Sequence, residues 1–156
     1  MTSLKSTHTI WNVEKKLIVT SVQGDLDKDD IERWERSLHM TLNEVESDST
    51  FKIMINMHGF KAVNIDAHKR FRGIIPLTLA QYNWKVGYVD LFEKEASEMV
   101  FTRTRGIACT GAAHVHHDAT KMELYEARFR RDNEQFFTDP QQAAQWIEEL
   151  ALPSNG

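Results

Sequence analysis

Two short segments rich in β-branched residues, 9–12 and 16–22, open the chain. Side chains in the second alternate with a period of two, which is typical of a strand. Glu14 and Lys15 form a tight connection between them, so we predict an antiparallel hairpin that ends at Gly24-Asp25. Asp27 then caps a helix whose apolar residues recur every three or four positions: Ile31, Trp34, Leu38, Leu42 and Val45.

The middle of the chain continues this alternation of strands and helices. Residues 51–57 are almost all apolar, which indicates a central strand covered on both faces. Residues 64–79 follow a helical pattern that Pro76 must end or kink. Residues 84–92 and 107–115 predict two more buried strands, with a short helix at 94–101 between them.

The last third begins with Asp118 as the N-cap of a helix in which Met122, Tyr125 and Phe129 share one face. Residues 135–138 predict a short strand, and Asp139 followed by Pro140 starts the closing helix. The whole pattern predicts an α/β fold: a mixed, mostly parallel sheet that opens with the hairpin, with helices on its faces. No segment has the composition of a linker, so we expect a single domain over residues 1–156.

Composition narrows the classes of protein. The net charge is −4, with 23 acidic and 19 basic residues, so the basic footprint of a nucleic-acid-binding protein is missing. No apolar stretch is long enough for a transmembrane segment, and residues 1–5 do not begin a secretory signal. Cys109 is the only cysteine, which excludes an intrachain disulfide; these features favour the cytoplasm.

Several segments together resemble the SpoIIAA-like family, which is related in fold to STAS domains and to CRAL-TRIO lipid-binding domains. They are the hairpin end Gly24-Asp25-Leu26, the helix with Trp34, residues 52–56 followed by Gly59-Phe60, and residues 136–139 followed by 143–147. The last pair, an aromatic edge strand and then an Ala-x-x-Trp helix, is the most specific.

The resemblance implies a binding or regulatory module rather than an enzyme. Its target would be a protein partner or a lipid-like, apolar small molecule. STAS antagonists are switched by phosphorylation of a hydroxyl after the central strand. The corresponding residues here, 58–75, contain no Ser or Thr, so the switch does not carry over.

The densest chemical feature is the run His114, His116 and His117, followed by Asp118. In a strand, His114 and His116 point to the same side, and two imidazoles so placed can hold a divalent metal. The run also lies at the carboxyl end of a predicted strand, where α/β sheets bind ligands. We therefore predict ligand binding at His58, His114, His116 and His117, with a metal at His114 and His116.

Alternative roles for these residues stay open. The candidates for a third metal ligand are His58 and Asp118, with His68 and Asp90 as weaker candidates, and the N-cap role alone already explains Asp118. The alternative function is a metal- or histidine-dependent enzyme built on the His114/His116/His117 cluster, although the sequence identifies no partner to fix a tautomer. A Cys109–His114 dyad would need both side chains on one face, which a regular strand does not give. Glu93, Glu95 and Glu98 are expected on a solvated face, and a homodimer burying Trp11, Trp84 or Phe92 is a third hypothesis.

Overall fold

The structure is a computed structural model that describes residues 5–151. Five strands lie side by side in one sheet, in the order β1 (Ser6–Asn12), β2 (Leu17–Leu26), β3 (Thr50–Met57), β5 (Ala108–His116) and β6 (Glu134–Phe137). Strand β1 is antiparallel to β2, and every other neighbouring pair is parallel. The predicted α/β fold, with a mixed sheet that opens with a hairpin, is therefore confirmed.

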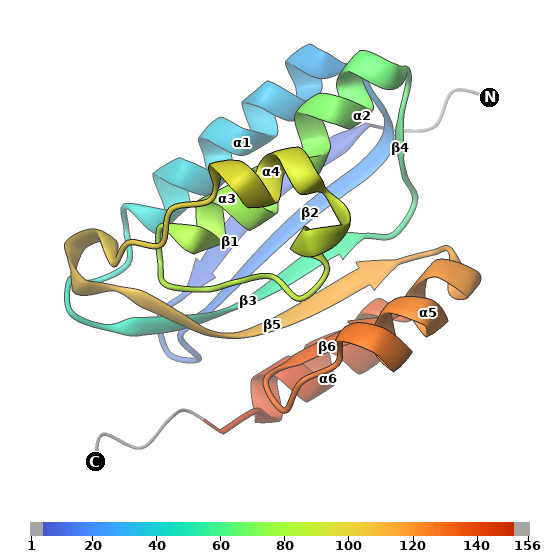
Figure 1. Ribbon diagram of the computed structural model, residues 1–156. Helices are drawn as coiled ribbons and strands as arrows, with labels where there is room; N and C mark the ends of the chain where they lie inside the picture. The colour runs from blue at the N-terminus through green and yellow to red at the C-terminus, as the bar shows by residue number, and fades with distance from the viewer. Residues whose placement is uncertain (1–4, 152–156) are drawn as a thin grey trace.

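Helices cover both faces of this sheet. Helices α1 (Lys28–Leu42), α2 (Ile65–Arg72), α3 (Ile74–Ala80) and α4 (Glu93–Glu98) lie together on one side of the strands (Figure 1). The larger apolar core lies on this side, around Trp34, whose indole N–H donates to Thr20 Oγ1 at 2.7 Å. Helix α6 (Pro140–Glu149) covers the other face, where Ala143 and Ile147 join a smaller core. None of the helices in the described part of the chain is long and apolar enough to cross a membrane.

Side-chain caps start the helices where the sequence predicts. Asp27 and Asp30 form a reciprocal capping box at α1. Asp118 accepts a hydrogen bond from the backbone N–H of Lys121 and so begins α5 (Ala119–Phe129). Asp139 caps α6, with Pro140 at its first position, where no amide donor is needed.

Two predicted boundaries differ from the structure. The antiparallel pairing of the hairpin reaches Gln23, just before Gly24, but β2 itself continues to Leu26. Gly24 adopts φ +89°, and residues 24–26 pair with the short β4 (Phe60–Ala62) instead of β3. The helical segment 64–79 breaks at Gly73 rather than at Pro76. Pro76 lies in the first turn of α3, where its missing N–H leaves no helical hydrogen bond unmade.

Residues 84–92 do not form the predicted strand. Tyr82, Trp84 and Val86 are buried while the residues between them are exposed, and this alternation imitates a strand. However, β5 already occupies the place beside β3. The segment crosses outside the sheet and ends in the short turn η1 (Val89–Leu91). Side chains bind its backbone instead: Arg131 donates to the carbonyl oxygen of Lys85 at 2.7 Å.

Strand β5 contains one extra residue, Thr110, between the pairs Phe51–Cys109 and Lys52–Gly111. Such a bulge exchanges the two faces of a strand at that point. Cys109 therefore joins the larger core with Ala112, on the face of His114, contrary to the regular strand assumed from the sequence.

Candidate functional site

A cavity of about 370 Å3 lies at the carboxyl ends of β3 and β5, between α2, α5 and the segment around η1. This is the end of a parallel sheet at which α/β proteins bind ligands. Six of its seventeen lining residues are aromatic: Phe60, Phe71, Tyr88, Phe92, Tyr125 and Phe136. Four aliphatic side chains complete the apolar surface: Met57, Ala62, Ile75 and Met122.

The remaining lining residues are all basic or imidazole-bearing: Lys61, Arg72, Lys121, His68, His114, His116 and His117. No Asp or Glu among the described residues lines the cavity. This contrasts with the net charge of −4 on the whole chain. The cavity is therefore an apolar space with an electropositive rim.

His114 is buried at the base of this cavity, and its Nε2 lies 2.9 Å from Glu134 Oε2. The two residues come together because Ala112 pairs with Glu134 and His114 with Phe136, so Glu134 lies diagonally across from His114. The Phe136 ring stacks on the imidazole with centroids 4.7 Å apart. The sheet register thus supplies both the carboxylate and the stacking partner of His114.

Glu134 is fully buried, and three groups compensate for its charge. Besides His114, the Arg131 guanidinium donates to Oε1 at 2.8 Å and the backbone N–H of Gly87 at 3.1 Å. Burial alone would raise the pKa of Glu134, but the hydrogen bond and charge of His114, together with Arg131, outweigh it and lower the pKa. An ionised carboxylate only accepts hydrogen bonds, so Nε2 of His114 carries the hydrogen.

Gly87 is required by this arrangement. A Cβ at that position would lie 2.8 Å from Glu134 Oε1, closer than real contacts allow. The bond from Gly87 and the Arg131–Lys85 bond tie the segment before η1 to β6. The same buried carboxylate therefore holds the imidazole of His114 and one wall of the cavity.

The other nitrogen of His114, Nδ1, is buried and has no hydrogen-bond partner among the described residues. Tyr88 packs edge-on against the imidazole, with ring centroids 5.5 Å apart. Burial and the nearby charge of Glu134 raise the pKa of Tyr88, so it is a neutral phenol. An unsatisfied polar atom of this kind is uncommon in folded proteins.

His116 and His117 are held differently, by backbone amides. The N–H of Asp118 donates to Nδ1 of His116, and the N–H of Gly59 to Nδ1 of His117, both at 3.0 Å. Because each Nδ1 is an acceptor, each Nε2 carries the ring hydrogen and is a donor. Burial, followed by Lys121 and His117, lowers the pKa of His116 to about 4, so this ring is neutral at pH 7.

The other predicted site residues are only partly brought together. His58 is exposed; its ring lies 5.9 Å from that of His117, and it does not line the cavity, whereas His68 does. Asp118 is the N-cap of α5. Asp90 lies on a different part of the surface and pairs with Lys85 at 3.3 Å.

A divalent metal at His114 and His116 stays a prediction. The described residues contain no group of three or more His, Cys, Asp or Glu side chains arranged to hold a metal ion. For a metal to bind Nε2 of His116 or His117, the hydrogen would have to move to Nδ1 and break the backbone hydrogen bond there.

Two weaker candidates are explained by burial. Cys109 shares a face with His114, but burial raises the pKa of its thiol, which donates to the Gly111 carbonyl oxygen at 3.5 Å. Glu95 is not on a solvated face as expected: it is buried and accepts from Arg72 Nε at 3.0 Å, while Glu93 and Glu98 are exposed.

The aromatic residues proposed for a homodimer surface differ in exposure. Trp84 is buried beneath the guanidinium of Arg131, 4.7 Å from its ring, and therefore cannot form a subunit surface. Trp11 and Phe92 are half-buried, and Phe92 lines the cavity. The homodimer itself stays a prediction.

Glu134 is the main site residue that the sequence alone did not reveal. The predicted strand began one residue later, at 135. Starting it at Glu134 would have placed this carboxylate on the face of Phe136, opposite the strand with His114. Lys121 was expected only as part of a helix, and Tyr88 as part of a strand that does not form.

Comparison of the chain with protein-family models, with curated proteins and with solved structures gives no significant match. The resemblance to the SpoIIAA-like family therefore stays a prediction. The function must be argued from the cavity itself.

Proposed function

We propose that this protein is a binding protein for an apolar small molecule, which it holds in the cavity at the carboxyl ends of β3 and β5. The observation that carries the proposal is the aromatic and aliphatic wall around about 370 Å3 of space. Small-molecule sites typically have volumes of roughly 300–1,000 Å3, are mostly apolar, and carry a few polar groups that orient the ligand. Both the size and the composition of this cavity agree with that description.

Saturable binding of a neutral, apolar fluorophore such as N-phenyl-1-naphthylamine tests the proposal. Ala62 lines the cavity and Ala127 is exposed on α5, so the two alanines offer a matched pair. We expect Ala62→Phe to fill space in the cavity and weaken binding by about tenfold, a loss of about 1.4 kcal/mol. Ala127→Phe should leave binding within about twofold of the wild type.

Circular dichroism and thermal unfolding establish that both variants are folded. If the fluorophore does not bind saturably, or if both substitutions weaken it equally, the cavity is not a binding site. A protein partner, the other target that the family resemblance implies, stays a prediction.

A histidine-dependent enzyme is the second candidate, and the His114–Glu134 hydrogen bond favours it. A carboxylate that fixes the tautomer of an imidazole is the usual support of a general base. Here it would leave Nδ1 of His114 as the basic atom. In the structure Nδ1 is enclosed, so a substrate would have to displace the side chains around it.

Reaction with diethyl pyrocarbonate, followed by mass spectrometry of the peptides, separates these two roles. A general base must be reachable, so the enzyme hypothesis requires modification of His114 in the folded protein. A structural imidazole leaves His114 unmodified while the exposed His117 reacts, and this result would exclude His114 as the general base.

A further inference from the structure

We propose that the ligand of this cavity is an apolar carboxylate, and that Lys121 and the ring N–H of His116 bind its negative group at the cavity rim. This inference rests on the proposed function, because it names the ligand class of the same site. It is carried by the arrangement of donors around the apolar wall.

Lys121 is a partly buried cation of the cavity rim. It lies in the first turn of α5, is half-buried and lines the cavity, yet it forms no ion pair within residues 5–151. Its ammonium lies 5.6 Å from the centre of the Tyr125 ring, over an apolar surface. Burial lowers the pKa of Lys121, so the site would gain from an anion that compensates the charge.

The nearest carboxylate along the chain, Asp118, provides only part of this compensation: its charge raises the pKa of Lys121, but burial outweighs it. One oxygen of Asp118 accepts the backbone N–H of Lys121 at 3.1 Å, which holds the carboxylate at the helix start. Arg72, the other half-buried cation of the rim, differs because the buried Glu95 already pairs with it. Of these two half-buried cations, Lys121 is the one without an ion pair in the described residues, so its charge is left for a ligand.

His116 supplies a second donor beside this charge. Its Nδ1 accepts the N–H of Asp118, so Nε2–H is free to donate. His117, with its Nδ1 occupied by Gly59, lies against it with ring centroids 4.2 Å apart and offers the same kind of donor. Imidazole N–H donors beside the Lys121 ammonium suit a ligand with a single negative charge. A carboxylate accepts hydrogen bonds from both the imidazoles and the ammonium.

The apolar wall indicates that the ligand has an apolar part besides its negative group. Six aromatic rings line the space behind the rim, so a small inorganic anion would leave most of the wall without contacts. A carboxylate joined to a hydrocarbon chain or ring satisfies both parts of the cavity. Its apolar part supplies most of the affinity and its charge the selectivity.

Displacement of bound N-phenyl-1-naphthylamine by decanoate and by decan-1-ol tests the inference, since the two molecules share one chain and differ in charge. We expect the wild-type protein to bind decanoate about tenfold more tightly than decan-1-ol, the effect of one charge-assisted contact. Lys121→Met should remove this preference by weakening decanoate alone. Lys121→Arg, which keeps the charge, should retain it.

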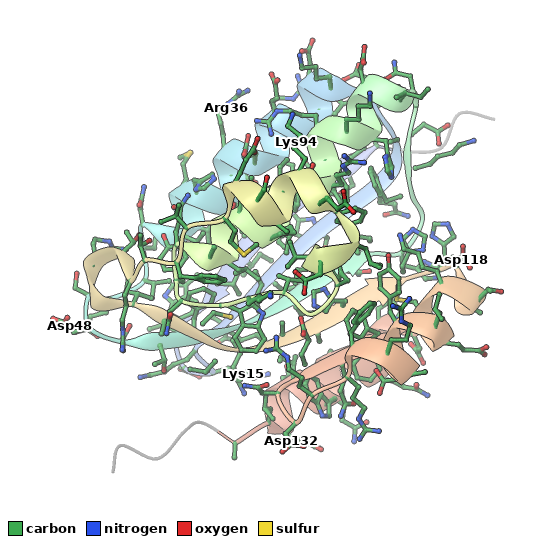
Figure 2. All side chains as sticks on the ribbon, viewed as in Figure 1. Lys15, Arg36, Asp48, Lys94, Asp118 and Asp132 are labelled. Carbon is green, nitrogen blue, oxygen red and sulfur yellow. The ribbon has the colours of Figure 1, made fainter. Side chains whose placement is uncertain are left out.

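Lys94→Met is the matched control. Lys94 lies on α4 and does not line the cavity, and Figure 2 shows it well away from Asp118 at the start of α5. This variant loses the same formal charge and should keep the full preference for decanoate. A similar loss in Lys94→Met and Lys121→Met would show a general effect of net charge and overturn the inference.

Two further results would also overturn it: equal displacement by decanoate and decan-1-ol in the wild type, or an unchanged preference in Lys121→Met. In each case the fluorophore still binds, so the proposed function stands. Equal displacement shows that the ligand class is wrong, and an unchanged preference in Lys121→Met shows that Lys121 does not bind the carboxylate. Absence of fluorophore binding contradicts the proposed function itself.

Discussion

The buried Lys52 and the partly buried Lys121, on opposite faces of the sheet, have different surroundings. On the α6 face, Lys52 of β3 donates to the carbonyl oxygens of Ile147 at 2.6 Å, Leu150 at 3.1 Å and Glu148 at 3.3 Å. These oxygens belong to the last turn of α6, where carbonyls lack helical partners. On the other face, the ammonium of Lys121 lies 5.6 Å from the centre of the Tyr125 ring and forms no ion pair in the described residues.

The difference indicates on which face the charged side chain has its partners within the chain. On the α6 face, the ammonium of Lys52 has its partners within the chain, so that charge needs nothing further for its stability. Around the cavity, Lys121 and Nδ1 of His114 are left without partners in the described residues. Unsatisfied polar groups are costly when buried, so a ligand that pairs with these two groups would stabilise the cavity face.

The largest effect is expected from Glu134→Gln, which breaks the buried ion pair on the cavity face. We expect a loss of about 3 kcal/mol in the free energy of unfolding, because Arg131 and His114 lose their common anion. Urea denaturation measures this loss. Glu123→Gln, an exposed change on α5, should stay within about 0.5 kcal/mol of the wild type. Equal effects of the two substitutions would mean that the buried pair contributes nothing.

Lys52→Met should follow, with a loss of about 2 kcal/mol, because three carbonyl oxygens at the end of α6 lose a charged donor. Methionine fills a similar volume, so the loss reports the hydrogen bonds more than the packing. Lys28→Met, on the exposed first turn of α1, is the control. Should Lys52→Met prove as stable as this control, the α6 face does not depend on Lys52.

The dependence on pH should be smaller but has a definite sign. The pKa of Glu134 is lower in the folded chain than in the unfolded chain, so its stabilising contribution is present above about pH 4.5 and is lost as the pH falls. The stability difference between wild type and Glu134→Gln should therefore narrow as the pH falls from about 7 to about 3. A difference that stays constant over this range would show that the carboxylate charge is not involved.

The smallest effect on stability is expected from Lys121→Met, within about 0.5 kcal/mol of the wild type or slightly more stable. The ammonium has no ion pair to lose within the described residues, and methionine suits the apolar wall. Urea denaturation of the ligand-free protein measures it. A loss of about 2 kcal/mol, like that expected for Lys52→Met, would show that Lys121 supports the fold and would erase the difference between the two lysines.

Local patterns along the chain were enough to predict most of the fold. The apolar stripe around Trp34, the N-caps Asp27, Asp118 and Asp139, and the apolar strand at 51–57 each depend on neighbours in sequence. The same holds for His114 and His116, which share a face because they are two residues apart in β5.

The site could not be completed in this way, because its partners are joined only by the sheet register. Glu134 of β6 contacts His114 of the neighbouring strand β5. Gly87 donates to Glu134 from a segment whose sequence is typical of a strand but which lies outside the sheet. The alternation of buried and exposed residues at 82–86 reflects the burial of side chains and not hydrogen-bonded pairing with a strand of the sheet. No local signal distinguishes an extended segment fixed by Arg131 from a member of the sheet.

Thr110 shows how much the site depends on counting residues. Deleting this one residue would restore strict alternation along β5. Either Cys109 or every side chain from Ala112 to His116 would then have to point to the opposite face of the sheet. In the second case the imidazoles would face α6 and Val115 would face the aromatic wall. The chemistry of this cavity thus depends on the number of residues in β5 as much as on the identity of its side chains.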